Sequence, residues 1–325
     1  MKYVIAALLI SAVPAMASKP ELTVYAPDYF ASEWGPGPKI TAQFEKICGC
    51  DLKFVTGDVL PRLLLEGEKT EADVVIGLNS DVTLRARESG LFAPHGQDLT
   101  GLTMPITWRD DIFLPFNWSE TAFIYDETRL DTPPKSFQEL LDAPDDLKII
   151  IQDPRSSVSG LALLLWVNTI YGSNADEAWK KLKPKVLTVT SGWSEAYGMF
   201  TNGEADMVLS FTTSPAYHIG VEQDTTKHAA IFPEGHYFIV ELAAQLKTTD
   251  QPELAKKFMD YILSPDFQDM IAEANWSYPA KLSRDLLPAY FAALARPTRT
   301  IFLDEQEAEA LRRPALNAWL NVFAR

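Results

Sequence analysis

Apolar and polar residues alternate in blocks along the first hundred positions, and the blocks indicate strands that are each followed by a helix. Each β-rich run leads through a polar or Pro/Gly loop into a stretch with helical spacing of its apolar residues. The strands are expected at 21–26, 51–56 and 72–78, and the helices at 39–49, 59–67 and 82–90. This alternation predicts a mainly parallel, doubly wound sheet.

A second series of the same kind follows, with strands expected at 147–153, 185–191 and 205–211. Two long extended segments, 111–128 and 236–247, stand where the chain would pass between the two series. The remainder, 251–276 and 304–325, has helical patterning. We therefore predict an α/β protein of two lobes joined by crossing strands. Lobe 1 comprises 18–117 plus 238–325, including returning C-terminal helices, and lobe 2 comprises 118–237.

Composition supports a folded chain and excludes some partners. The 325 residues are 47% hydrophobic and 22% charged, which is enough apolar material for sizeable cores. Lys and Arg number 29 against 44 Asp and Glu, giving a net charge of −15 with no basic run. Such a chain is unsuited to binding nucleic acid or an anionic membrane through counterion release.

The N-terminus has the three-part pattern of a secretory signal peptide. Residues 1–17 contain one cation at Lys2, an apolar run ending at Val13, and Pro14 before small residues. The alternative, a membrane anchor, needs about 20 apolar residues, and this run is shorter. We expect cleavage after Ala17 and export of the mature protein.

Cys48 and Cys50 are the only cysteines and flank a single glycine. In an oxidising compartment two thiols this close could form a small disulfide. A catalytic redox pair usually has two spacer residues and a helix N-terminus that lowers one thiol pKa. The spacing therefore favours a structural role.

Six loops are expected to converge on one cleft, because ligands of doubly wound sheets bind beyond the carboxyl ends of the strands. These loops are 27–34, 56–59, 78–81, 152–160, 190–197 and 210–217. Their side chains are mainly aromatic, hydroxylic and acidic, with little Lys or Arg beyond Arg155.

Several loop residues have both a structural and a ligand-binding interpretation. Ser156 and Ser157 precede an apolar helix, so they are either ordinary N-caps, which composition favours, or contacts to an anion such as phosphate. Trp193 is either a core residue or a flat wall for a ring or cation. The hydroxyls of 211–217 are common in turns, and Trp276 lies in a loop where packing is the commoner explanation.

Motifs of the major enzyme classes are absent from the sequence. It has no glycine-rich dinucleotide fingerprint, no phosphate loop, no His-Glu-x-x-His and no Gly-x-Ser-x-Gly. The four histidines show no metal-ligand spacing. Binding without turnover, without a metal and without a cofactor is the simpler inference.

Stretches spread over nearly the whole mature chain resemble one known family. They are LTVYAPDYFASEWGPGP, ADVVIGL, QDPRSSVSGLALLLWV, VTSGWSEAYGMF, LSFTTSPAYHI, EGHY and NWSYP. They are similar to the thiamine-binding solute receptors of bacterial ABC importers. The resemblance implies a two-lobed, type II-like periplasmic binding protein (Venus flytrap) fold, no catalysis, and thiamine or its mono- or diphosphate as ligand. It also implies a periplasmic monomer that serves a membrane permease and its ATPase.

The same resemblance assigns roles to individual residues. Ser156 and Ser157 would meet the phosphate or hydroxyethyl end of the ligand, and Trp193 and Tyr217 would lie against its rings. The cleft would be lined by Phe211, Thr212, Thr213 and Ser214 and closed by Trp34 and Trp276. Asp28 and Asp58 are candidates for balancing the thiazolium charge or accepting from the aminopyrimidine, with solvated turn aspartates as the alternative. Closure would rotate the lobes about strands near 115–125 and 236–245.

Two other functions remain open at the level of sequence. One is a receptor of the same fold for ferric ion or a polyamine; a ferric site typically uses tyrosinates, and Phe211 stands where a Tyr is usual in the family. A polyamine receptor would need several carboxylates in the cleft. The other is an exported enzyme that processes thiamine or a pyrimidine through Cys48 or Cys50, although these precede the 51–56 strand, at the end opposite the predicted cleft.

Overall fold

The computed structural model describes residues 19–31 and 35–323. The expected signal peptide at 1–17 and the predicted site residue Trp34 lie outside the described residues. Among the helices of the described part, none combines the length and apolar character that a membrane span requires.

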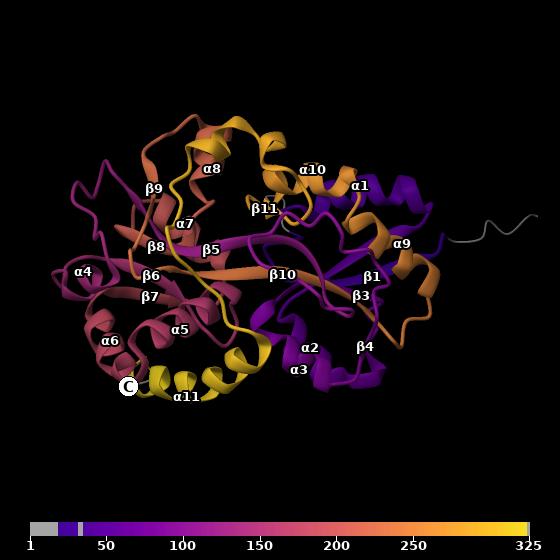
Figure 1. The fold of residues 1–325 in the computed structure, drawn as a ribbon, viewed down its shortest axis with the longest axis horizontal. Helices are drawn as coiled ribbons and strands as arrows, with labels where there is room; N and C mark the ends of the chain where they lie inside the picture. Colours follow the sequence, from indigo (N-terminus) through magenta and orange to yellow (C-terminus); the bar gives the residue numbers. More distant parts are fainter. Residues whose placement is uncertain (1–18, 32–34, 324–325) are drawn as a thin grey trace, which may run out of the picture.

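The strands form a path that runs through the whole molecule (Figure 1) in the order β2-β1-β3-β10-β5-β8-β6-β7. The strands on this path are β1 (Glu21–Ala26), β2 (Asp51–Thr56), β3 (Val74–Asn79), β5 (Leu114–Asp126), β6 (Ile149–Gln152), β7 (Val186–Thr190), β8 (Met207–Phe211) and β10 (His236–Leu246). Four short strands pair with β5 or β10: β4 (Phe92–Ala93), β9 (Lys227–Ala230), β11 (Tyr278–Pro279) and β12 (Thr300–Ile301).

The strand pairing confirms two parallel units joined by crossing strands. β2, β1 and β3 are parallel at one end, and β7, β6 and β8 are parallel at the other. Both long strands are antiparallel to their neighbours on this path, whereas the short β12 pairs in parallel with β10. β5 pairs with β10 through residues 114–120 and with β8 through residues 121–125, so a single strand passes from one lobe into the other.

The helices cover the faces of the two units (Figure 1). Around the first unit lie α1 (Gly37–Cys48), α2 (Val59–Glu66), α3 (Thr83–Glu88), α9 (Pro252–Ile262) and α10 (Pro265–Ala274). Around the second lie α4 (Phe137–Asp142), α5 (Val158–Tyr171), α6 (Ala175–Leu182), α7 (Trp193–Thr201) and α8 (Pro215–Tyr217). Every residue from Ser159 to Asn168 is buried, which makes α5 the central core helix of the second lobe.

The last helix, α11 (Glu305–Phe323), differs from the prediction that the C-terminal helices return to lobe 1. It packs against α5 and α6 of the second lobe and also contacts α3 and the short helix η2 (Ser80–Val82) of the first. Ala315 and Trp319 are buried in the core around α5. An apolar stripe predicts that one face of a helix is buried, but it does not say against which partner. The other lobe boundaries stay a prediction.

Cys48 and Cys50 form a disulfide with Cα atoms 5.2 Å apart, so neither is a free thiol. Gly49 between them ends α1 in the left-handed conformation, φ 66°, and its N–H donates to the carbonyl of Glu45. The disulfide precedes β2, whereas Gly57 and Asp58 beyond the other end of that strand line a cavity. A structural role is consistent with this placement.

Candidate functional site

A cavity of about 420 Å³ lies where loops of both lobes meet, within the range of small-molecule sites. The first lobe contributes residues after β1 and after α10, including Asp28 and Trp276. The second contributes the turns that open α5 and α7 and the turn after β8. Glu241 of β10, one of the two crossing strands, also lines it. Four of the six loops predicted to converge therefore contribute to this cavity, whereas the loops at 56–59 and 78–81 line a second one.

Aromatic rings form two walls of this cavity. Trp193 stacks on Tyr197 with ring centroids 4.7 Å apart, and Tyr217 meets Trp276 edge to face at 5.2 Å. Trp276 has a backbone φ of 50°, a left-handed conformation that is uncommon for a bulky residue and is often found at binding sites. Trp193, Tyr217 and Trp276, which the sequence singled out, thus come together, while Tyr197 was not predicted.

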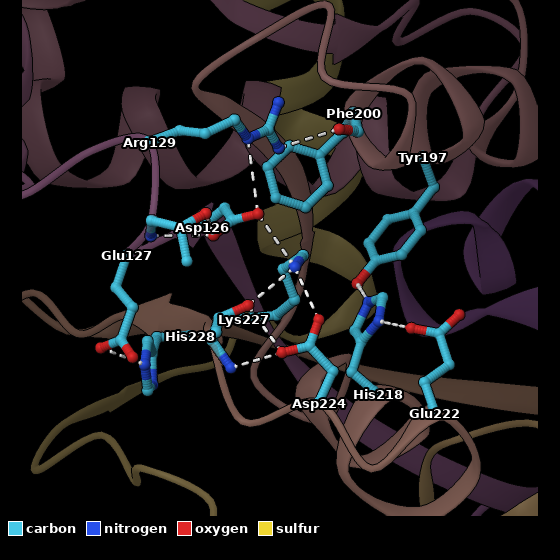
Figure 2. A network of polar contacts seen from close by, with 12 residues as sticks. Asp126, Glu127, Arg129, Tyr197, Phe200, His218, Glu222, Asp224, Lys227 and His228 are labelled. Carbon is cyan, nitrogen blue, oxygen red and sulfur yellow. Dashed lines mark hydrogen bonds and ion pairs between the residues drawn. The ribbon is translucent and has the colours of Figure 1, made fainter.

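A hydrogen-bonded network behind one wall holds its rings in place (Figure 2). The Tyr197 hydroxyl lies 2.9 Å from Nε2 of His218, whose Nδ1 lies 2.6 Å from a Glu222 carboxylate oxygen. His218 and Glu222 are the ends of one π-helical turn, a feature often found at functional sites. The indole N–H of Trp193 donates to the Ser210 hydroxyl at 2.8 Å. The orientation of this wall is therefore determined by buried polar contacts.

Asp224 brings a third potential metal-ligating group within 4.8 Å of His218 and Glu222, a grouping that the sequence analysis did not find. Each group already has a protein partner (Figure 2). Asp224 accepts from Lys227 at 2.8 Å, and this bond holds the pKa of Asp224 well below its usual range. Lys227 also pairs with Asp126 at 2.9 Å. These contacts account for the cluster as a hydrogen-bond and ion-pair network.

Hydroxyl groups lie at the start of α5. Ser157 caps this helix by accepting the Gly160 N–H at 3.4 Å, so the N-cap interpretation is confirmed for this residue. The Ser156 hydroxyl donates to the carbonyl of Ser191 at 2.7 Å. Both serines also line the cavity, so their structural role leaves them available to a ligand.

Of the four neighbouring residues in the turn after β8 that were predicted to line the cleft, two do so and two do not. Phe211 and Ser214 line the cavity. Thr212 and Thr213 instead lie buried behind its wall, where the Thr213 hydroxyl is 3.1 Å from that of Ser119. The Thr212 N–H donates to the carbonyl of Glu120, which ties the turn to β5 and turns these two side chains inward.

The two predicted aspartates occupy different places. Asp28 lies at a constriction opposite Gly192, where a Cβ on that glycine would be 3.2 Å from the Asp28 carboxylate. Desolvation there raises the pKa of Asp28. Asp58 does not line the first cavity but a second one, of about 610 Å³, on the other side of this constriction. Asp28, Ser156 and Ser157 line both.

Glu241 is the site residue that sequence reasoning missed most clearly. Its side chain is buried, with the residue 6% exposed, and it accepts from the Asn275 amide at 2.7 Å and from the Tyr29 hydroxyl. Burial raises the pKa of Glu241 to about 7. One signal was present: it is the only acid within the apolar run HYFIVELAA. A lone carboxyl in a buried strand requires polar partners.

The two lobes, the crossing strands and the lined cleft define a receptor for a small solute. Residues 25–269 match the family model of bacterial extracellular solute-binding proteins. The thiamine-binding periplasmic protein of Brucella abortus biovar 1 (strain 9-941) is 48% identical over 98% of this chain and 96% of its own length. A solved periplasmic thiamin binding protein superposes with a TM-score of 0.92 at 44% identity, covering 97% of this chain and 100% of that one.

The chain therefore belongs to the bacterial extracellular solute-binding protein family, within the group of thiamine-binding periplasmic proteins. Members of this group are transport receptors, and the enzyme alternative is set aside. Iron-bound HitA from Pseudomonas aeruginosa also superposes, with a TM-score of 0.76 over 94% of this chain and 99% of that one. At 22% identity this likeness shows the fold alone.

Proposed function

We propose that this protein captures thiamine, free or as its mono- or diphosphate, in the 420 Å³ cavity and delivers it to an ABC importer. The observation that carries the proposal is the presence of two aromatic pairs in the lining of one cavity, Trp193 on Tyr197 and Tyr217 against Trp276. The relatives named above, which match nearly all of the chain, support the same ligand.

The chemistry of thiamine suits this cavity. The vitamin joins a cationic thiazolium ring to an aminopyrimidine, and a desolvated cation over an aromatic face gains about 2 kcal/mol. The Asp28 carboxylate lies at the edge of the cavity and would balance the thiazolium charge. Glu241 faces the cavity from β10 and would accept hydrogen bonds from the aminopyrimidine. Neither cofactor nor catalytic group is part of this function.

The proposed contacts follow the predicted set with changes. Trp193, Tyr217 and Trp276 would contact the rings, and Phe211 and Ser214 would line the cavity beside them. Ser156 and Ser157 would lie at the hydroxyethyl or phosphate end. Thr212 and Thr213 would support the wall from behind, and Asp58 would act only on a ligand that reaches the second cavity. Trp34 remains a prediction from the resemblance.

Transport would proceed by closure of the lobes. Rotation about β5 and β10 would enclose the ligand, and the closed form would dock on the permease, whose ATPase powers uptake. The signal-peptide pattern at 1–17 and the periplasmic relatives support action in the periplasm. That the protein acts there as a monomer is part of the proposal and rests on the resemblance alone.

Calorimetry with the purified protein tests the proposal. Thiamine should bind, and Trp193→Ala should weaken binding by at least about tenfold, because about 2 kcal/mol of cation–π and stacking energy is lost. Trp108→Ala is the matched control: Trp108 is equally half-buried but lines neither cavity. Absence of heat with thiamine and both phosphates would refute the function.

A polyamine is the second ligand to test, because three carboxyl groups, Asp28, Glu222 and Glu241, line the cavity. Heat with spermidine and none with thiamine would favour that receptor instead. The flat aromatic walls favour a ligand with rings over a flexible chain.

A further inference from the structure

The second cavity combines three arginines from different elements. Arg85 comes from α3 of the first lobe, Arg155 from the turn before α5 of the second, and Arg312 from α11. With a volume of about 610 Å³ it is large enough for a diphosphate group. It adjoins the first cavity at the constriction made by Asp28, Gly192 and Ser156.

Two of these arginines have carboxylate partners. Arg155 binds Asp153, with Nε 2.9 Å from one carboxylate oxygen. Arg312 binds Glu309 through two hydrogen bonds of 2.9 and 2.7 Å. Their positive charges are therefore largely balanced within the protein.

Arg85 differs from both. It is partly buried, and no ion pair or hydrogen bond joins its side chain to any residue in the described ranges. Its neighbour Arg312 carries the same charge, and burial together with that charge lowers the pKa of Arg85, although Glu309 partly offsets the effect. An anion from outside the chain would stabilise a guanidinium in such a place.

Phosphate is the anion that this lining suits. A guanidinium presents a planar fork of N–H donors that matches two phosphate oxygens. Ser156 and Ser157 offer hydroxyls on the wall shared by the two cavities. Asp28 at the constriction would repel an anion that remained in the first cavity, and Asp58 is the other acid of the second cavity, exposed at its edge. The charge pattern suits a ligand with its cation on one side of Asp28 and its anion beyond it.

We propose that Arg85 and Arg312 form an anion subsite that takes the terminal phosphate of thiamine diphosphate while the rings occupy the first cavity. This inference rests on the proposed function. An anion in this position would contact α3 of the first lobe and α11, which packs on both lobes.

Calorimetry on the full protein and two variants tests the subsite. Arg85→Gln should weaken the binding of thiamine diphosphate by about tenfold, because one charge-assisted bidentate contact is lost. The affinity for thiamine should not change. Arg85→Lys keeps the charge without the planar fork of donors and should lose less affinity for thiamine diphosphate. Arg109→Gln is the matched control, since it removes the same charge from an exposed residue that lines neither cavity. Circular dichroism confirms that each variant is folded.

Inorganic pyrophosphate distinguishes a ligand subsite from a site for a free anion. Competition of pyrophosphate with thiamine diphosphate, but not with thiamine, would support the proposal. If Arg85→Gln abolished pyrophosphate binding but kept full affinity for thiamine diphosphate, the site would be one for a free anion. That result would overturn the proposal.

The two proposals fail in different ways. If the wild-type protein binds neither thiamine nor its diphosphate, the proposed function is wrong. If it binds both and Arg85→Gln weakens both equally, or neither, the function stands and the anion subsite is wrong.

Discussion

At the scale of single residues, the chemistry of the cleft depends on a few buried polar groups placed among rings. Glu241 is the most deeply buried acid on the cavity wall, and its bonds to Asn275 and Tyr29 hold its carboxyl in place. Its pKa of about 7 means that it gains charge within the ordinary pH range. The affinity of the protein for a cationic ligand should therefore depend on pH.

The direction of that dependence follows from charge. Thiazolium is a permanent cation, so it is attracted more strongly when Glu241 is ionised. Affinity for thiamine should rise several-fold between pH 6 and pH 8 as this carboxyl loses its proton. Calorimetry at the two pH values measures the change.

Glu241→Gln should remove most of this rise, because the amide does not titrate. If the variant kept the full pH dependence of the wild type, another group, with Asp28 the first candidate, would be responsible.

At the scale of secondary-structure elements, α5 connects the core of the second lobe to the cleft. Its residues from Ser159 to Asn168 are buried, whereas its cap at Ser157 lines both cavities. The hydroxyl that satisfies the helix end is therefore also presented to a ligand. This explains why the cap and ligand-binding interpretations of Ser157 do not compete.

The structural part of this role can be measured separately. Ser157→Ala should lower the free energy of unfolding by about 1 kcal/mol, because it leaves the Gly160 N–H without its acceptor. Urea denaturation measures the change. Ser157→Thr keeps a capping oxygen and should retain most of the stability; equal loss in both variants would indicate that packing, rather than the cap, is affected.

At the scale of the whole molecule, the lobes are joined near Asp81 of η2. This buried carboxylate accepts from Tyr237 of β10 at 2.6 Å and from Asn79 at 2.7 Å, and η2 also contacts α11. Burial raises the pKa of Asp81 from 3.8 to about 7. A raised carboxyl pKa contributes stability below its unfolded value of 3.8, and that stability is lost as pH rises through 7.

Removing this charge should therefore stabilise the folded protein most at high pH. Asp81→Asn should gain stability relative to the wild type as the pH rises. Its free energy of unfolding minus that of the wild type should be about 2–3 kcal/mol larger at pH 8 than at pH 5. Denaturation at both pH values gives the difference. Asp131→Asn, an exposed control, should show almost none; a similar pH effect in that variant would contradict the assignment to Asp81.

The periodicity of apolar residues was enough to predict the strand–helix series and both crossing strands, since alternation and helical spacing are local properties of the chain. Within the described residues β1 and β2 have the predicted bounds, and β5 and β10 lie within the two long extended segments. The loops that carry Trp193 and Ser157 were also predictable, because strand ends of a doubly wound sheet converge.

Long-range packing decided the rest. Thr212 and Thr213 have the composition of cleft residues, yet a backbone bond to β5 turns them inward. The apolar face of α11 was visible in the sequence, but its burial against α5 and α6 was not. Asp28 and Asp58 are similar turn acids in sequence, yet Asp28 lines both cavities and Asp58 only the second. Arg85 lies near Arg312, more than two hundred positions away in the chain. The sequence by itself determined the elements, their order and the family, because these depend on local pattern and on motifs. Only the tertiary structure decided which polar groups share a cavity, since distances between remote residues depend on how the lobes pack together.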